Sequence, residues 1–373
     1  MTIKGCATLE GTARYKDRFN EVAASGHFRL EQQLWLSSIG IGTYLGKPDE
    51  ATDVRYTESI VRAVELGCNV IDTAANYRFQ RSERAIGDGL KLIEDSPSFS
   101  RDELVICTKG GYLPFDGQPP TDVRRYVEET FVRTGIADLS DIVGGSHCMT
   151  PAYLQSQIDQ SLVNLGLDCI DVYYLHNPES QLASISGVEF DVRLRAAFER
   201  LEANIAGGRI MKYGVATWNG FRAEPSAREH HSLENMVEIA REVGGVNHGF
   251  GFIQLPINLA MPEGLVSRNQ IVRGEQMSVL EAAGALGVTV IASASLLQGK
   301  VTRGVPEHMR ELLGGLSTAA QTGIQFVRST PGITTGLIGM SRLEHVDENL
   351  QLVKIPPALS EEYQRLFDGM EEG

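Results

Sequence analysis

Apolar positions along the chain occur mainly as short continuous runs rich in valine and isoleucine, with longer amphipathic stretches between them. Continuous apolar runs are typical of strands that are buried on both faces of a parallel sheet. Eight such runs, SIGIGTY, NVID, ELVICTK, CIDVYYLH, KYGVAT, GFIQL, VTVIAS and TTGLIG, begin at Ser38, Asn69, Glu103, Cys169, Lys212, Gly251, Val288 and Thr334. The pattern therefore predicts eight parallel strands.

Stretches with helical spacing separate these runs, including those that begin at Thr57, Tyr153 and Glu275. Gly67 and Gly287 stand at the ends of two of them, where a C-cap glycine is expected. Alternation of strands and helices predicts an α/β fold. Eight such units favour a closed (β/α)8 TIM barrel, and a doubly wound open sheet is the structural alternative.

The spacing of the runs also predicts the domain organisation. Successive runs lie about one βα unit apart, except that the interval between the third and fourth is about twice as long. We interpret the excess, residues 110–150, as an insertion after the third strand. The barrel is assigned to residues 34–355, with an N-terminal extension at residues 1–33 and a C-terminal tail at residues 356–373.

Composition narrows the range of partners and locations. The 34 basic and 48 acidic residues give a net charge of −14, which argues against nucleic-acid or anionic-membrane binding. The five cysteines contain no CxxC pair, which fits a reduced, cytoplasmic chain. No apolar run has the length of a membrane span or signal peptide, and no motif indicates an oligomeric state.

Polar side chains stand where successive predicted strands end. Asp72 ends the second strand and Tyr77 follows five residues later, Lys109 ends the third, and His176 ends the fourth. Each residue alone has a simpler interpretation, such as a salt bridge, a buried core histidine, packing or a helix cap. Their joint position at the C-terminal ends of barrel strands, where barrel enzymes place their chemistry, favours an active site.

These four residue types suit the reduction of a carbonyl by hydride. The oxygen that gains negative charge needs a proton donor, which we assign to Tyr77. A phenol has a pKa of about 10, and the ammonium of Lys109 is expected to lower it. Asp72 would hold Lys109 charged, and His176 would orient the substrate oxygen.

At these residues the sequence resembles the aldo-keto reductase superfamily, from about Leu34 to Leu350. The resemblance extends to GIGTY at residues 40–44, SERAIG at 82–87, GVATWN at 214–219 and GMSRLEHVDENL at 339–350. It implies that Asp72, Tyr77, Lys109 and His176 form the catalytic tetrad of the family.

The resemblance also implies a nicotinamide cofactor at the C-terminal face of the barrel, with each part of the cofactor matched to its own residues. The ribose is matched to Thr43, Tyr44 and Asp72; the carboxamide region to Thr217, Asn219 and Gln254; the loop after the seventh strand to Ser293, Leu296 and Gln298; and the adenosine end to Gly339, Ser341, Arg342, Glu348 and Asn349. Ser293 stands where the family commonly has an aromatic residue. Met340 and His345 replace basic residues that clasp a 2′-phosphate in many members, while Arg342 remains and favours NADPH over NADH.

The expected function is an NAD(P)-dependent oxidoreductase that acts on an aldehyde, a ketone, an aldose or the corresponding alcohol. The GxGxxG fingerprint of an open-sheet nucleotide site is absent, and no motif with metal-ligand spacing occurs, so no metal is predicted. Two alternatives stay open: a Schiff-base lyase that uses Lys109, and a binding protein that senses the nicotinamide redox state.

Overall fold

Eight parallel strands form a closed barrel in the computed structural model, which describes residues 2–303 and 305–367. The barrel strands are β3 (Ile39–Gly42), β4 (Val70–Asp72), β5 (Val105–Gly110), β6 (Ile170–His176), β7 (Ile210–Ala216), β8 (Phe250–Pro256), β11 (Thr289–Ser293) and β12 (Ile333–Gly339). Each strand pairs with the next along the chain, and β12 pairs with β3 to close the ring. This confirms all eight predicted strands and rejects the open sheet.

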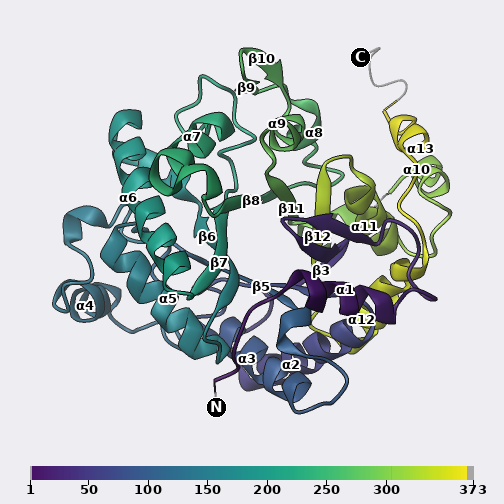
Figure 1. The fold of residues 1–373 in the computed structure, drawn as a ribbon, viewed down its shortest axis with the longest axis horizontal. Helices are drawn as coiled ribbons and strands as arrows, with labels where there is room; N and C mark the ends of the chain where they lie inside the picture. Colours follow the sequence, from purple (N-terminus) through teal and green to yellow (C-terminus); the bar gives the residue numbers. More distant parts are fainter. Residues whose placement is uncertain (1, 304, 368–373) are drawn as a thin grey trace.

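A helix follows each barrel strand, and together the helices surround the barrel (Figure 1). They are α2 (Glu50–Glu65), α3 (Arg81–Glu94), α5 (Pro151–Leu165), α6 (Gly187–Ala206), α7 (Leu233–Gly244), α9 (Val279–Leu286), α11 (Ala319–Ser329) and α12 (Leu343–Asn349). Their apolar faces pack on the outer surface of the strands and form the largest hydrophobic cluster of the protein. The interior of the barrel holds a second, smaller apolar cluster.

One predicted helix begins later than its spacing suggested. The stretch from Glu275 reads as helical, yet Glu275–Met277 is strand β10, which pairs antiparallel with β9 (Gln270–Val272). Ser278 then caps α9, because its side chain accepts from the backbone of Glu281, whose side chain accepts from Ser278 in return. A capping box of this kind fixes where a helix starts more firmly than hydrophobic spacing does.

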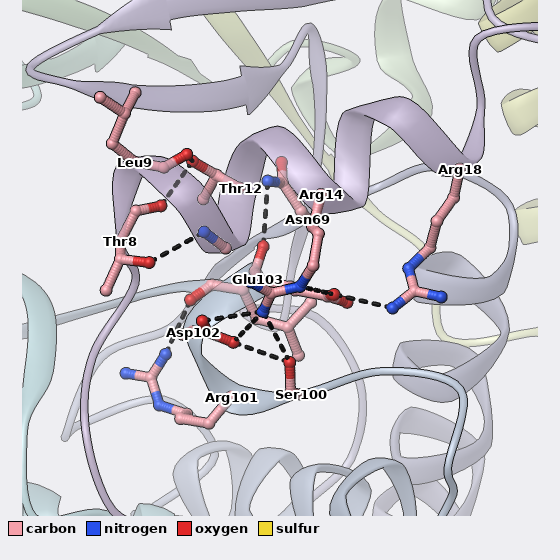
Figure 2. Close-up of polar contacts among 12 residues, drawn as sticks. Thr8, Leu9, Thr12, Arg14, Arg18, Asn69, Ser100, Arg101, Asp102 and Glu103 are labelled. Atoms are coloured by element: carbon pink, nitrogen blue, oxygen red, sulfur yellow. Dashed lines mark hydrogen bonds and ion pairs between the residues drawn. The ribbon is translucent and has the colours of Figure 1, made fainter.

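The N-terminal extension and the strand that follows it pack against the end of the barrel where the strands begin, and Ala7 of the extension joins the interior apolar cluster. Leu34 and Leu36 of β2 (Leu34–Ser37), which pairs with β1 (Phe28–Glu31), pack into the interior apolar cluster. Helix α1 (Leu9–Arg18) lies beside this hairpin, and its Arg14 and Arg18 both pair with the fully buried carboxylate of Glu103 (Figure 2). The extension thus contributes to the core, at the end where the strands begin.

The insertion is a compact substructure of short elements with its own apolar cluster. It contains α4 (Val123–Val127), a π-helical turn at Glu128–Val132 and a 3₁₀ turn at Leu139–Asp141. Its cluster is built from Leu113, Val127, Phe131, Ala137 and Cys148, together with Tyr153 of α5. The insertion leaves the barrel at the end of β5, at Gly110, where the strands finish. The remaining helices are α8 (Glu263–Val266), α10 (Glu307–Leu312) and α13 (Ser360–Gln364).

Candidate active site

The four predicted catalytic side chains come together at the C-terminal end of the barrel. Asp72 is the last residue of β4 and His176 the last of β6, while Lys109 is the penultimate residue of β5. Tyr77 lies in the turn between β4 and α3 and is the fourth member of the group, with its ring centroid 5.7 Å from that of His176. Asp72, Tyr77 and His176 line a cavity of about 910 Å³, and Lys109 lies buried behind them.

Asp72 and Lys109 form a buried ion pair. Lys109 Nζ donates to Asp72 Oδ1 at 2.5 Å and to the Thr73 carbonyl at 2.7 Å, and Gln254 Nε2 donates to Asp72 Oδ2 at 2.9 Å. Burial alone would lower the pKa of Lys109, but the Asp72 carboxylate more than offsets this effect and raises it. Burial raises the pKa of Asp72 against the opposing pull of Lys109 and Gln254. The short contact keeps the ammonium charged beside Tyr77.

Tyr77 faces the ammonium, with Lys109 Nζ 5.1 Å from the centroid of its ring. We expected Lys109 to bring the pKa of this phenol below its usual value. Instead burial raises the pKa of Tyr77, and although the charge of Lys109 lowers it, Asp72 opposes that charge. The phenol is therefore protonated at neutral pH, which is the state that a proton donor requires.

His176 is held in the neutral form. Burial lowers its pKa well below the usual value, and the nearby positive charge of Lys109 adds to the effect. Its Nδ1 is buried without a partner among the described residues. Tyr112 stands edge-on to the ring, with centroids 5.2 Å apart. A neutral imidazole at the cavity wall can donate a hydrogen bond to a substrate oxygen without placing a second cation beside Lys109.

The insertion contacts the site through His147, which is buried. His147 Nε2 donates to the backbone oxygen of His176 at 2.8 Å, and its Nδ1 accepts from Gln181 Nε2 at 2.9 Å. Arg193 Nη1 fixes the Gln181 amide by donating to Oε1 at 2.7 Å. Gly111 has a φ of +152°, and a Cβ there would lie 2.7 Å from the His176 oxygen, so only glycine allows this close approach.

A buried carboxylate that sequence reasoning missed organises the loop after β7. Glu179 Oε1 accepts from Thr217 Oγ1 at 2.7 Å and from the backbone nitrogens of Trp218 and Asn219 at 2.8 and 3.0 Å. Burial opposes ionisation, but His231 and these donors prevail and lower the pKa of Glu179 to about 2. Glu179 follows His176 by three residues, and its role depends on loop contacts that have no sequence signature.

Most of the predicted cofactor residues line the same cavity. They are Thr43, Tyr44, Asp72, Thr217, Gln254, Ser293, Leu296, Gln298, Gly339, Ser341, Glu348 and Asn349. Two others do not: Asn219 donates its backbone N–H to Glu179, and Arg342 is exposed at the start of α12. Phe115 of the insertion packs on Phe79, with ring centroids 5.9 Å apart.

Several cavity residues carry no sequence signal for this role. Tyr56 reaches the cavity from α2, and Asn76 and Asn177 follow catalytic strands. Tyr56, Asn76 and Asn177 can be assigned to the site only once the helices and loops are placed in space. Trp218, which belongs to the GVATWN motif, also lines the cavity and is 44 % exposed.

The cavity suits a dinucleotide in its length and in its polar groups. It runs from Tyr77 and His176 to Glu348 and Asn349, which belong to elements far apart in sequence. Asn349 is 5 % exposed and its Oδ1 finds no partner among residues 2–303 and 305–367. An unpaired buried acceptor is costly unless a ligand donor meets it. The amino group of adenine is such a donor.

The described residues contain neither a metal-binding cluster nor a membrane-spanning helix. No group of three or more histidine, cysteine, aspartate or glutamate side chains is placed to hold a metal ion there. Within the same part of the chain, no helix combines the length and apolar character needed to cross a bilayer.

Comparison with known proteins identifies the family. Residues 38–239, more than half of the chain, match the model of the aldo/keto reductase family. L-glyceraldehyde 3-phosphate reductase of Escherichia coli K12 is 22 % identical over 321 residues, which cover 78 % of this chain and 76 % of that protein. A Schizosaccharomyces pombe protein named "Putative voltage-gated potassium channel subunit beta" is 24 % identical over 352 residues, 90 % of each chain.

Solved structures share the fold. A Klebsiella pneumoniae aldo/keto reductase in complex with NADP and acetate aligns with a TM-score of 0.60 at 19 % identity, over 92 % of this chain and 95 % of that one. The glycerol dehydrogenase of Gluconobacter oxydans aligns with a TM-score of 0.59 at 18 % identity, over 92 % and 95 %. With the barrel, the family match and these relatives together, the chain belongs to the aldo/keto reductase family of oxidoreductases.

Proposed function

We propose that this protein transfers hydride between a nicotinamide cofactor and a carbonyl or alcohol substrate, with Tyr77 as the general acid and base. The observation that carries the proposal is the position of Tyr77. Its ring lies close both to His176 and to the ammonium of the buried Asp72–Lys109 pair, at the wall of a cavity long enough for a dinucleotide.

The residues present fit NADPH or NADH. Glu348 and Asn349 would hold the adenine, Gly339 and Ser341 the adenosine phosphate, and Gln298 the pyrophosphate. Gln254 would reach the carboxamide, because its Nε2 is engaged by Asp72 and its Oε1 is left for the amide N–H. Bound at this site, the reduced nicotinamide supplies the hydride and the oxidised form accepts it.

The protein's own groups handle the proton and the substrate oxygen. In reduction, the Tyr77 hydroxyl gives its proton to the oxygen, and Lys109 stabilises the phenolate that remains. Neutral His176 donates a hydrogen bond to the same oxygen and fixes its position. In oxidation the phenolate takes the hydroxyl proton back. The raised pKa of Tyr77 favours reduction at neutral pH and oxidation at higher pH.

The substrate class follows from the polar groups beside the tetrad. Asn177 Nδ2 donates to Tyr112 Oη at 3.2 Å, and both residues line the cavity together with Asn76. Amide and phenol groups at this depth suit a substrate with hydroxyl groups next to its carbonyl, so we assign small polar carbonyls and aldoses. D-threo-aldose 1-dehydrogenase of a Pseudomonas species, 29 % identical over 169 residues, acts on such sugars by its name.

The alternative of a Schiff-base lyase has less support. A nucleophilic lysine must lose its proton, whereas the contact of Lys109 with Asp72 keeps it charged and raises its pKa.

The decisive experiment is Tyr77→Phe, which removes the hydroxyl and keeps the ring. We expect kcat to fall about 10²- to 10⁴-fold, because a general acid is lost, with little change in cofactor Kd. Steady-state rates with aldehydes, ketones and aldoses, and dinucleotide titrations followed by Trp218 fluorescence, measure the two effects. A Tyr77→Phe protein that turns over within a few-fold of the wild type would refute the role of Tyr77. Cofactor binding without turnover of any of these substrates by the wild type would favour the redox sensor instead.

A further inference from the structure

The segment before α1 is tied to the start of β6, at the end of the barrel opposite the cavity. Three of its backbone amides are donors: Ile3 N to Gly166 O at 2.8 Å, Gly5 N to Asp168 Oδ1 at 2.8 Å, and Ala7 N to Asp171 Oδ1 at 2.5 Å. Since β6 spans seven residues and rises about 3.3 Å per residue, this contact lies roughly 20 Å from His176. Chemistry here is separate from that of the active site.

Two cysteines meet at this contact. Cys6 and Cys169 both line a hollow of about 580 Å³, together with residues of the turn between α6 and β7. The backbone contacts on either side of Cys6, from Gly5 to Asp168 and from Ala7 to Asp171, place it opposite Cys169. Cys6 is half-buried, whereas Cys169 is buried. The other three cysteines are buried elsewhere in the fold, so only Cys6 combines solvent access with a neighbouring thiol.

The surroundings make the two sulfurs unequal. The Cys169 thiol lowers the pKa of Cys6 by hydrogen bonding to it, and the charge of Arg101 helps, although burial and Asp171 oppose them. The same hydrogen bond raises the pKa of Cys169, and burial raises it further. Arg101 is fixed in place by donating to Asp171 Oδ2 at 2.7 Å. Cys6 is also the thiol that a peroxide can reach from solvent, whereas Cys169 is buried beside it.

We infer that Cys6 and Cys169 are a peroxide-reactive pair that closes to a disulfide. The Cys6 thiolate attacks a peroxide oxygen, breaks the O–O bond and becomes a sulfenic acid, with water or an alcohol as the leaving product. The Cys169 sulfur then displaces the sulfenic hydroxyl, which leaves as a second water with the Cys169 proton. Two thiols are oxidised and one peroxide is reduced.

The local backbone allows the sulfurs to close to bonding distance. Cys6 lies in a segment without helix or strand structure, next to Gly5, which has a φ of +85° and open space around it. A disulfide needs the sulfurs about 2.05 Å apart. Cys169 is fixed at the start of β6, so Cys6 is the residue that moves.

The disulfide would add a covalent bond to the three amide hydrogen bonds that now hold this segment. It would join α1, and with it the ion pairs of Arg14 and Arg18 to Glu103, to the barrel wall (Figure 2). A bond that closes so long a loop restricts the unfolded chain strongly. We therefore expect oxidation to raise the midpoint of thermal unfolding by several degrees and to leave turnover unchanged.

The test treats the full-length, reduced protein with hydrogen peroxide and follows intact mass and non-reduced peptide maps. We expect loss of two hydrogen atoms, a peptide joining Cys6 to Cys169, and reversal by dithiothreitol. Cys6→Ser should lose the cross-link and the thermal shift, while Cys148→Ser, which leaves the pair intact, should keep both. Cys169→Ala should stop at the sulfenic acid, which a dimedone probe traps on Cys6.

Other products would overturn the inference. Oxygen addition at Cys6 in the wild type without a disulfide would show that Cys169 does not resolve the sulfenic acid. A cross-link between molecules, or one that involves Cys68, Cys107 or Cys148, would show that the pair is not the reactive site. Equal alkylation rates for all five cysteines under native conditions would show that Cys6 is not more reactive than the others.

Discussion

Replacing Lys109 with methionine tests the buried ion pair most directly. The Lys109 side chain is 1 % exposed and that of Asp72 5 %, so the substitution leaves a buried carboxylate. Among the described residues, Gln254 Nε2 is then its one remaining side-chain donor. Removing one partner of a buried pair costs about 3–5 kcal/mol. A domain is stable by roughly 5–15 kcal/mol in total. The Lys109→Met protein should therefore fold, and urea unfolding at pH 7 should measure a large decrease in its free energy of unfolding.

The loss of stability should change with pH, and the titration of Asp72 decides whether it grows or shrinks as the pH rises. Burial already raises the pKa of Asp72 in the folded state, and loss of the ammonium raises it further. A carboxyl with a raised folded pKa adds stability below its unfolded value of about 4, and this is lost as pH rises toward the folded pKa. The deficit of Lys109→Met should therefore be smallest below about pH 4 and grow as the pH rises toward 8.

A matched double variant separates stability from catalysis. Asp72→Asn together with Lys109→Met removes the stranded charge, so it should recover most of the stability and lose the pH dependence of the deficit. It should not recover turnover, since the phenolate of Tyr77 still lacks its cation. A deficit below about 1 kcal/mol at pH 7, or one that does not change with pH, would refute the buried ion pair as the source of the effect.

Three further substitutions probe groups around the tetrad. Glu179→Gln should weaken dinucleotide binding and lower the free energy of unfolding by about 1.5–3 kcal/mol at pH 7, because a charged acceptor for three donors is lost. Since the folded pKa of Glu179 is about 2, this difference in stability should vanish in strong acid, which acid unfolding curves of the two proteins will test. His147→Phe should lower kcat and cost about 1–3 kcal/mol in urea unfolding, since the His176 carbonyl and the Gln181 amide lose a partner, and unchanged kinetics would reduce His147 to a structural anchor. Arg342→Ala should weaken the binding of NADPH relative to NADH by a few-fold, as expected of an exposed ion pair worth about 1 kcal/mol or less. Equal losses of affinity for the two cofactors in titration calorimetry would show that Arg342 does not recognise the 2′-phosphate.

The barrel could be predicted from the sequence because its strands are buried on both faces. That burial forces continuous apolar runs, and the polar residues that end them, such as Asp72 and His176, stand out for the same reason. The start of α9 was misplaced because hydrophobic spacing does not show a capping box at Ser278. Local hydrogen bonding decided that boundary.

The rest of the site depends on contacts between distant segments. Tyr56 lies on α2, where its pattern is that of a core residue, and it reaches the cavity only after α2 packs against the loop at Leu45. Glu179 reads as a surface residue in a polar stretch, yet the loop after β7 folds over it. The direction of the Tyr77 pKa shift could not be predicted from the sequence either. It depends on burial, which is set by the whole barrel and outweighs the charge of Lys109.

The two ends of the barrel place their buried charges for different purposes. At the end where the strands begin, Glu103 is met by Arg14 and Arg18 and Asp171 by Arg101, so charges are neutralised where α1 docks. At the other end, Tyr77 and the neutral ring of His176 surround a single ion pair and leave room for a ligand oxygen. Because a buried charge costs stability unless it is paired, each end keeps its buried carboxylates stable by pairing them with a cation. Oxidation at Cys6 would strengthen the first end and leave the geometry of the second unchanged.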